Sequence, residues 1–340
     1  MLRQFAGSLL FTLAALIAAL AYGWLGTGSM QATGGVVWIV LVLAVLEISL
    51  SFDNAVVNAA VLTDMDPVWQ RRFLTWGMLI AVFGMRIVFP LVIVALAAGL
   101  GPADALRLSL TRPAQYEAIV SSAHGAISGF GGAFLLLVGL GFFIDDAKSV
   151  HWIGWIERRL AALALVHAVG IALVLALLLV IAHGLPGLEA LVFVEAGLGG
   201  IIAHVLVEAI GTLLESREAA RRAAGALVRS GLGGFVYLNV LDASFSFDGV
   251  IGAFALSNSM VIIALGLSIG AMFVRSITLL LVRHGTLAEY RYLEHGAFWA
   301  ILALGVIMLV SVRVAVPETV TGLIGAVLIG LSLLASRRGG

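Results

Sequence analysis

Residues 46–54 read Leu-Glu-Ile-Ser-Leu-Ser-Phe-Asp-Asn, and residues 241–249 read Leu-Asp-Ala-Ser-Phe-Ser-Phe-Asp-Gly. The two stretches share a leucine, an acid, a serine and then Ser-Phe-Asp at the same spacing, and each lies inside a long apolar segment. Acidic residues are almost never buried without a partner, so two of them inside one apolar segment are already unusual. The recurrence of this pattern predicts an internal repeat.

The composition of the chain excludes a soluble globular protein. Of the 340 residues, 62% are hydrophobic and only 11% are charged, whereas a soluble domain carries about 25% charged residues. The 19 basic and 19 acidic residues cancel, so no basic face is available for nucleic acid. Because the sequence contains no cysteine, it offers no disulfide, thiolate metal site or cysteine nucleophile.

Two enzyme motifs are missing from the sequence. It contains no G-x-x-x-x-G-K-S/T loop for ATP and no H-E-x-x-H pair for a metalloprotease. We therefore expect neither an ATP-driven pump nor an intramembrane protease. The sequence predicts no enzymatic activity and no permanently bound cofactor.

Ten segments are long and apolar enough to cross a membrane as helices. A helical span needs about 20 mostly apolar residues, because the hydrocarbon core is about 30 Å thick and a helix rises 1.5 Å per residue. Alternation with a period of two is nowhere sustained, so we expect an all-α, polytopic membrane protein with one transmembrane domain over residues 1–340. The expected spans are 5–25, 36–62, 74–100, 127–144, 160–183, 190–214, 232–257, 259–283, 297–316 and 319–336.

The first expected span has an alternative interpretation. A charged start at Arg3 followed by an apolar run is also typical of a secretory signal peptide. The apolar run 5–25 is long, and the distribution of basic residues accommodates it as a span. We therefore expect this segment to be retained in the membrane.

Basic residues between the spans predict the orientation of the chain. If the N-terminus is cytoplasmic, fourteen basic residues lie on the cytoplasmic side and three lie outside. The positive-inside rule then predicts a multi-pass protein of the inner (plasma) membrane with both termini in the cytoplasm. The segment 36–62 would run inward and 232–257 outward. The repeat halves, about 36–100 and 232–283, would thus be inverted, as in many secondary transporters.

Polar side chains in the two matching segments fall on neighbouring ridges of a helix, because their spacings of three and four residues match the helical period. Such polar sectors cannot face lipid, so we expect the two sectors to meet near the middle of the membrane. The sectors comprise Glu47, Ser51, Asp53, Asn54 and Asn58 in the first segment and Asp242, Ser246 and Asp248 in the second.

The charges at this depth predict a binding site for a divalent cation. Four carboxylates and two arginines sum to −2, which one divalent cation would neutralise. Ligands that are all oxygen suit Mg²⁺, Ca²⁺ and Mn²⁺ rather than Zn²⁺ or Cu⁺. An empty site would relieve its charge by binding protons, which favours metal–proton exchange. The expected metal ligands are Glu47, Asp53, Asn54, Asp242, Asp248, Ser51 and Ser246, and the charge-balancing residues are Arg86 and Arg275.

Two alternatives remain open from these residues. The carboxylates could instead pair with the two arginines as buried ion pairs that hold the halves together. In the sixth expected span, His204 and Glu208 lie one helical turn apart, a spacing at which two side chains can bind an additional metal ion. The simpler interpretation is a histidine bonded to a neighbouring helix and a glutamate near the inner interface.

The pattern Glu47-x-x-x-Ser51-x-Asp53-Asn54 with Arg86, and its counterpart Asp242-x-x-x-Ser246-x-Asp248 with Arg275, resembles the TerC family within the LysE-type transporter superfamily. The resemblance implies an integral membrane protein that exports divalent metal, most often manganese, with acidic residues of the two repeats as ligands. A link to tellurite resistance gave that family its name. Gly249 stands where the first repeat has Asn54, and the chain has about three spans more than a minimal member, so it resembles a longer branch.

Together these features predict a secondary transporter in the lipid bilayer. We expect it to export a divalent cation, Mn²⁺ before Ca²⁺, in exchange for protons. One alternative is an exporter of a small cationic amino acid, whose ammonium group the acids would bind. Another is a membrane assembly or stress factor of the tellurite-resistance type, which transports nothing and whose polar core is structural.

Overall fold

The computed structural model describes residues 2–338 except Asp64, Met78, 145–149, 163–167, 224–230, Ala255, Asn258, 285–288 and Ala315. All regular structure within these ranges is helical, which confirms the all-α class. Seven helices of the described chain are long and apolar enough to cross a membrane. They are α1 (Leu2–Thr27), α2 (Met30–Leu50), α8 (His124–Ile144), α11 (Gly187–Ala223), α13 (Met260–His284), α15 (Leu293–Ser311) and α16 (Glu318–Arg338).

Seven of the ten expected spans correspond to these helices, and in the other three expected segments the described residues form shorter apolar helices. The 14 residues of α10 reach about 21 Å at 1.5 Å per residue, short of the 30 Å core, whereas the 23 residues of α12 reach about 35 Å. The segment 74–100 is divided into π-helical turns and a short α-helix. The elements concerned are η1 (Phe73–Gly77), η2 (Ile80–Val88), α5 (Phe89–Ala98), α10 (Val169–Ala182) and α12 (Leu232–Phe254), whose described apolar part is Leu232–Phe245.

The remaining helices are short, and proline begins three of them at the position where a missing N–H is harmless. Before α4, Asp66 also caps the helix by accepting a hydrogen bond from the N–H of Val68 at 2.8 Å. These helices are α3 (Phe52–Thr63), α4 (Pro67–Arg72), α6 (Pro102–Thr111), α7 (Pro113–Ser122) and α9 (Gly154–Ala161).

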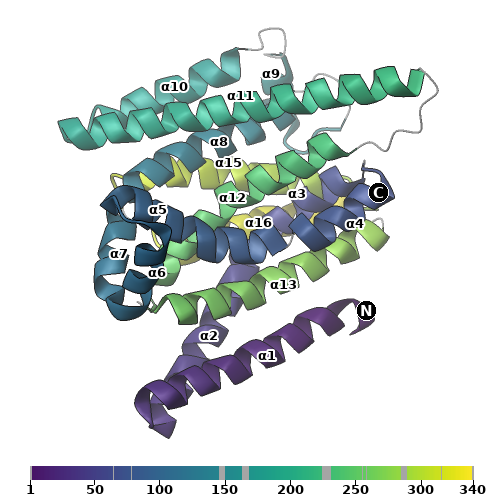
Figure 1. The fold of residues 1–340 in the computed structure, drawn as a ribbon. Helices are drawn as coiled ribbons and strands as arrows, with labels where there is room; N and C mark the ends of the chain where they lie inside the picture. The colour runs from purple at the N-terminus through teal and green to yellow at the C-terminus, as the bar shows by residue number, and fades with distance from the viewer. Residues whose placement is uncertain are drawn as a thin grey trace.

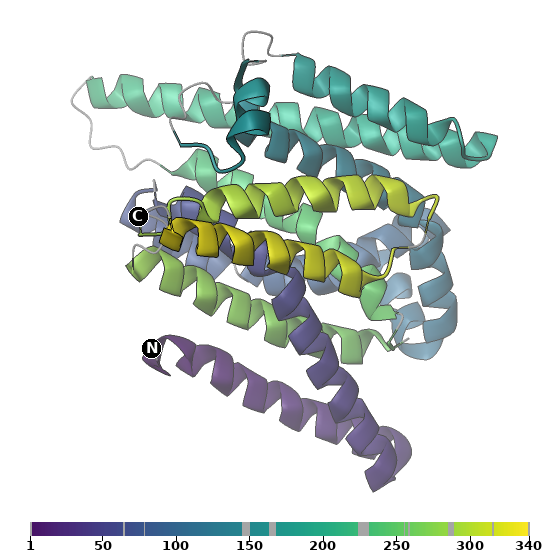
Figure 2. The same cartoon turned by 180° about the vertical axis from the view of Figure 1, so that it is seen from behind.

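The long helices form a bundle in which α3 and α12 lie near the centre (Figure 1), and α15 and α16 pack side by side on the face seen in Figure 2. Helices α10 and α11 cover one side of it, outside α8, and α1 lies on the opposite side against α2 and α13. Both termini lie at the same end of the bundle in the two views (Figures 1 and 2). The outward faces of α1 and α11 expose large apolar side chains such as Leu10, Leu13 and Ile202, which fits a protein embedded in a lipid bilayer.

Glycines allow the central helices to touch through their backbones. A Cβ atom on Gly132 of α8 would lie 3.0 Å from the carbonyl oxygen of Gly305 in α15, and one on Gly305 would lie 3.2 Å from that of Gly132. Close packing through small residues is the usual way in which membrane helices associate. Helix packing therefore explains glycines such as Gly132 and Gly305 at helix contacts.

A buried carboxylate, Glu157, connects the start of α9 to α15. It accepts hydrogen bonds from the backbone N–H groups of Trp152 (2.8 Å) and Ile153 (3.1 Å) and from the indole N–H of Trp299 (3.0 Å). The imidazole Nε2 of His295 lies 3.7 Å from the same carboxylate. Glu157 thus satisfies N–H groups that the first turn of a helix leaves without acceptors.

Replacing Glu157 with glutamine is expected to lower the free energy of unfolding by about 2 kcal/mol. The amide has one acceptor oxygen in place of two, and a buried N–H left without an acceptor costs about 1–3 kcal/mol. Denaturant unfolding of the purified protein in detergent measures the change. The matched control is Glu289→Gln, because the side chain of Glu289 is exposed. An equal effect of both substitutions would contradict the anchoring role of Glu157.

Candidate functional site

The first matching segment is not one helix, because the chain breaks at Ser51. Helix α2 ends at Leu50 and α3 begins at Phe52, and Ser51 between them has φ −101° and ψ 16°. Figure 2 shows α2 leaving the bundle at a steep angle to the central helices. The expectation of a continuous helix over 36–62 is therefore wrong, and its polar side chains are divided between two helices. Discontinuous helices are typical of the substrate sites of secondary transporters.

Glu47, in the last turn of α2, forms a buried ion pair with Arg86 of η2. The two side chains are 2% and 3% exposed. The same carboxylate oxygen, Oε1, also accepts a hydrogen bond from the hydroxyl of Ser51 at 2.9 Å. Arg86 thus contacts a carboxylate, which fits both the charge-balancing role and the alternative of a structural ion pair, and Glu47 is neutralised inside the protein.

Two glycines of α13 allow Glu47 to lie so deep. A Cβ atom on Gly270 would lie 2.4 Å from Cβ and Cγ of Glu47 and 3.0 Å from the carbonyl oxygen of Ala44. One turn earlier, a Cβ atom on Gly266 would lie 2.5 Å from Cβ of Leu43. Helix α2 therefore packs directly on the backbone of α13 at this point.

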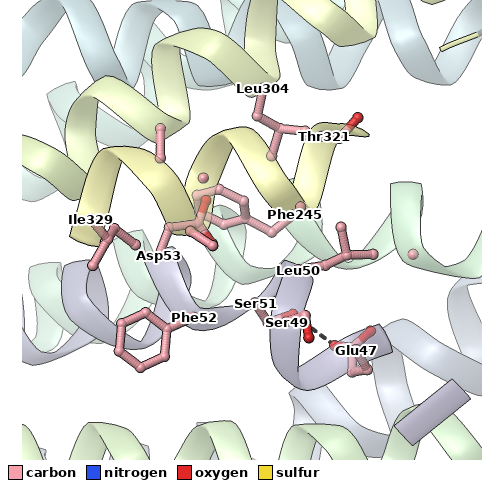
Figure 3. Close-up of a pocket in the computed structure, with 15 residues that line it drawn as sticks. Glu47, Ser49, Leu50, Ser51, Phe52, Asp53, Phe245, Leu304, Thr321 and Ile329 are labelled. Atoms are coloured by element: carbon pink, nitrogen blue, oxygen red, sulfur yellow. Dashed lines mark hydrogen bonds between the residues drawn. The ribbon is translucent and has the colours of Figure 1, made fainter. Parts of the chain in front are cut away.

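Asp53, in the first turn of α3, is buried and lines a cavity of about 30 Å³. Its Oδ1 accepts a hydrogen bond from the backbone N–H of Asn54 at 2.9 Å. Glu47 and Ser51 line the cavity on one side, and Thr321 lines it from α16 (Figure 3). A water molecule needs about 10–15 Å³ of such volume, so the cavity has room for about two waters or one ion.

The two polar sectors meet between α3 and α12, as expected. The side-chain amide of Asn54 donates a hydrogen bond to Oδ1 of Asp242 at 2.7 Å, and both residues are buried. At the other end of the second motif, a Cβ atom on Gly249 would lie 3.0 Å from Oε2 of Glu47. The second motif therefore runs antiparallel to the first.

Three oxygen atoms in this region accept no hydrogen bond from the described residues. They are Oδ1 of Asn54, Oδ1 of Asn58 and Oδ2 of Asp242. Asn54 and Asn58 lie one turn apart on the same face of α3, and both are 2% exposed. Burying a polar atom without a partner costs about 1–3 kcal/mol, so three such acceptors would lower the stability of the fold unless something binds them. These three acceptors are therefore candidates for the ligands of a cation.

Three of the expected site residues are not seen at the site. Two have side chains outside the described residues, and the third, Arg275, makes a different contact. The side chains of Ser246 and Asp248 lie outside the described residues. Arg275 donates from Nε to the carbonyl oxygen of Leu74 in η1 at 2.8 Å, so its observed contact is with a backbone carbonyl rather than a carboxylate. Among the residues described, no group of three His, Cys, Asp or Glu side chains could hold one metal ion.

His204 and Glu208 do lie together, as their spacing predicts. Nδ1 of His204 is 3.9 Å from Oε2 of Glu208, and both line a second cavity of about 440 Å³. This cavity lies between α3, α8, α11, α12 and α15, and it shares no lining residue with the cavity beside Asp53.

Comparison with known proteins identifies a family but no characterised relative. Neither a curated protein nor a solved structure matches the chain. These comparisons give no link to the TerC or LysE-type families, so that resemblance stays a prediction. A family described as "Protein of unknown function (DUF475)" matches residues 52–339, from α3 to the end of α16, which is most of the chain. The chain therefore belongs to the DUF475 family.

Proposed function

We propose that the protein is a secondary transporter that binds a divalent cation between α3 and α12. The observation that carries this proposal is the set of three buried oxygen acceptors, on Asn54, Asn58 and Asp242, that receive no hydrogen bond from the described residues. Oxygen ligands of this kind favour Mn²⁺, Ca²⁺ or Mg²⁺. We expect Mn²⁺ first and Ca²⁺ second.

Charge supports a divalent rather than a monovalent ion. Glu47 is neutralised by Arg86, whereas Asp53 and Asp242 form no ion pair with the described residues. Asn54 connects these two carboxylates, since its backbone N–H bonds Asp53 and its side-chain amide bonds Asp242. Their combined charge of −2 is costly to bury, so one divalent cation, or protons in its absence, would stabilise the site.

The same geometry disfavours the alternatives. A cavity of about 30 Å³ beside Asp53 has room for a bare ion but not for an amino acid. A purely structural polar core would have its buried acceptors paired, which those of Asn54, Asn58 and Asp242 are not among the described residues. A transported cation accounts for the unpaired oxygens of Asn54, Asn58 and Asp242, and the cavity beside Asp53, which none of these three residues lines, would offer it a neighbouring position.

The antiparallel motifs and the break at Ser51 also support a mechanism of secondary transport. Inverted repeats that meet at discontinuous helices are a recurrent architecture of secondary transporters. We infer that the halves 36–100 and 232–283 are related in this way, that the likeness to the TerC family reflects it, and that both termini face the cytoplasm at a plasma membrane. Export coupled to proton entry follows from a site that exchanges one divalent cation for two protons.

Cation binding is expected to stabilise the purified protein against heat. A ligand at one hundred times its Kd that binds only the folded state adds about 2.7 kcal/mol. Thermal unfolding in detergent with Mn²⁺, Ca²⁺, Mg²⁺ or Zn²⁺ should therefore show the largest shift with Mn²⁺, and Asp242→Asn should abolish that shift. Asp104→Asn, at an exposed position of α6, is the matched control and should retain it.

A second pair of variants tests whether the effect on Mn²⁺ binding is specific to the proposed cation ligands. Asn54→Ala should weaken the Mn²⁺ shift, whereas Asn239→Ala should not, because the amide of Asn239 donates to the carbonyl of Phe235 within its own helix. In reconstituted vesicles, Asp53→Asn and Asp242→Asn should each abolish Mn²⁺ flux. Flux that survives both substitutions, with the protein present at the normal level, would refute the proposal.

A further inference from the structure

The cavity of about 440 Å³ has the size and lining of an aqueous chamber. Its wall combines apolar residues such as Phe134 and Val138 with four polar side chains, those of His204, Glu208, Thr212 and Tyr237. An ion with six waters occupies roughly 200 Å³, at about 30 Å³ per water. A hydrated cation therefore fits this cavity, whereas the cavity beside Asp53 has room for a bare ion.

The cavity lies in line with the unpaired oxygens of Asn54 and Asn58 along one face of α3. Asn54, Asn58 and Val61 are spaced four and three residues apart, so they share that face, and Val61 lines the cavity. At 1.5 Å per residue, Val61 lies about 4.5 Å along the helix from Asn58. The chamber thus ends about one helical turn from the buried amide of Asn58.

His204 and Glu208 line this chamber as a neighbouring pair. Nδ1 of His204 and Oε2 of Glu208 are 3.9 Å apart, and the ring of His204 packs edge-on against Phe134 with centroids 5.7 Å apart. Glu208 is 72% exposed, and it lies nearer than His204 to the end of α11 that shares a side of the bundle with both termini. Imidazole and carboxylate together are suitable ligands for a divalent cation that keeps part of its water.

We propose that this cavity is the aqueous route by which the cation reaches Asn58, and that His204 and Glu208 bind the hydrated ion at its entrance. The inference rests on the proposed cation site. It adds a second, weaker site and a direction of access, from the end of the bundle that carries the termini.

The absence of cysteine from the chain allows a direct test of water access. Single cysteines are introduced at Val61, Val207 and Thr212, which line the cavity, and at Leu206 and Leu213, which neighbour two of them but are exposed on the outward face of α11. Vesicles of known orientation are treated with a membrane-impermeant, cationic thiosulfonate. Only thiolates react, so a cysteine in water should react at least about tenfold faster than its lipid-facing neighbour.

The expected result is fast reaction of Val61→Cys, Val207→Cys and Thr212→Cys from the face that carries the termini, and slow reaction of Leu206→Cys and Leu213→Cys. Fast reaction from the opposite face only, or equal rates at Val207→Cys and Leu206→Cys, would overturn the access route. This modification experiment requires no metal ion, so its failure is distinct from failure of the proposed transport function.

The entrance site is tested by protection with Mn²⁺. In the Val61→Cys background, Mn²⁺ should slow the modification, and adding His204→Gln or Glu208→Gln should raise the protective concentration by about tenfold, as loss of one ligand to a metal does. Elution from a size-exclusion column verifies that each variant is folded. Unchanged protection in both variants, or no protection at all while the three cavity cysteines react, would overturn the role of His204 and Glu208.

Discussion

Replacing Arg86 with alanine is expected to destabilise the protein by about 3–5 kcal/mol, the usual effect of removing one partner from a buried ion pair. Glu47 would stay 2% exposed, packed on Gly270 with no guanidinium beside it. It keeps the hydroxyl of Ser51 as a donor, which offsets only part of the loss. Denaturant unfolding in detergent measures the change. Arg107→Ala, at an exposed position of α6, is the matched control and should have little effect.

The double variant Arg86→Met with Glu47→Met separates stability from function. Replacing both members of a buried ion pair by apolar residues of similar volume is often neutral for stability. We therefore expect the double variant to recover most of the lost free energy. If the pair is structural, Mn²⁺ should still stabilise this variant. If Glu47 is a ligand, as the sequence predicts, the Mn²⁺ shift should disappear although the protein is folded.

Replacing Gly270 with valine is expected to destabilise the protein by about 3 kcal/mol, the upper end of the usual cost of overpacking. The first carbon of the new side chain would lie 2.4 Å from Glu47 and 3.0 Å from the carbonyl of Ala44, so α2 and α13 must separate. That separation would also move Glu47 away from Arg86. We therefore expect the Mn²⁺ shift to weaken together with the stability.

The control for Gly270 is another helical glycine that has free space around it. No atom lies within 4 Å of the Cβ position on Gly330 of α16. Gly330→Ala should therefore stabilise the protein by up to about 1 kcal/mol, the difference in helix propensity. If Gly270→Val were tolerated as well as Gly330→Ala, the close packing of α2 on α13 would not hold Glu47 in place.

The helical spans and the meeting of the two motifs could be predicted from the sequence. Apolar segments of about 20 residues correspond to helices α1, α8 and α13 because length and hydropathy determine a span. The contact between Asn54 and Asp242 follows from the rule that polar sectors in apolar helices must find each other. The pairing of Glu47 with Arg86 follows from the same rule.

Other features left no mark in the sequence. The break at Ser51 has no glycine or proline beside it, so no local pattern announces it. The proposed repeat aligns Arg275 with Arg86, but Arg275 contacts the carbonyl of Leu74 in the π-helical turns of η1. Aligning Arg275 with Arg86 by sequence could not predict that their surroundings differ in backbone conformation.

Two residues outside the two matching segments have structural roles that the sequence did not predict. Thr321 of α16 lines the cavity beside Asp53, although a threonine near the start of an apolar segment carries no signal of a site. Glu157 anchors α9, and its place in the first turn of a short helix after Gly154 was the available indication. Contacts between distant helices depend on packing, which periodicity does not encode.

The break at Ser51 gives the molecule a pivot on one side only. Helix α2 packs on α1, α13 and α16, whereas α3 packs on α12, α13 and α15. Helix α12 carries the second motif without interruption from Leu232 to Phe254. A twist at Ser51 would swing α2 as a lever and carry Glu47 with it, while the partner motif stays rigid. A conformational change that uses these two motifs would therefore move α2 relative to a static α12, and the two halves would not move equally.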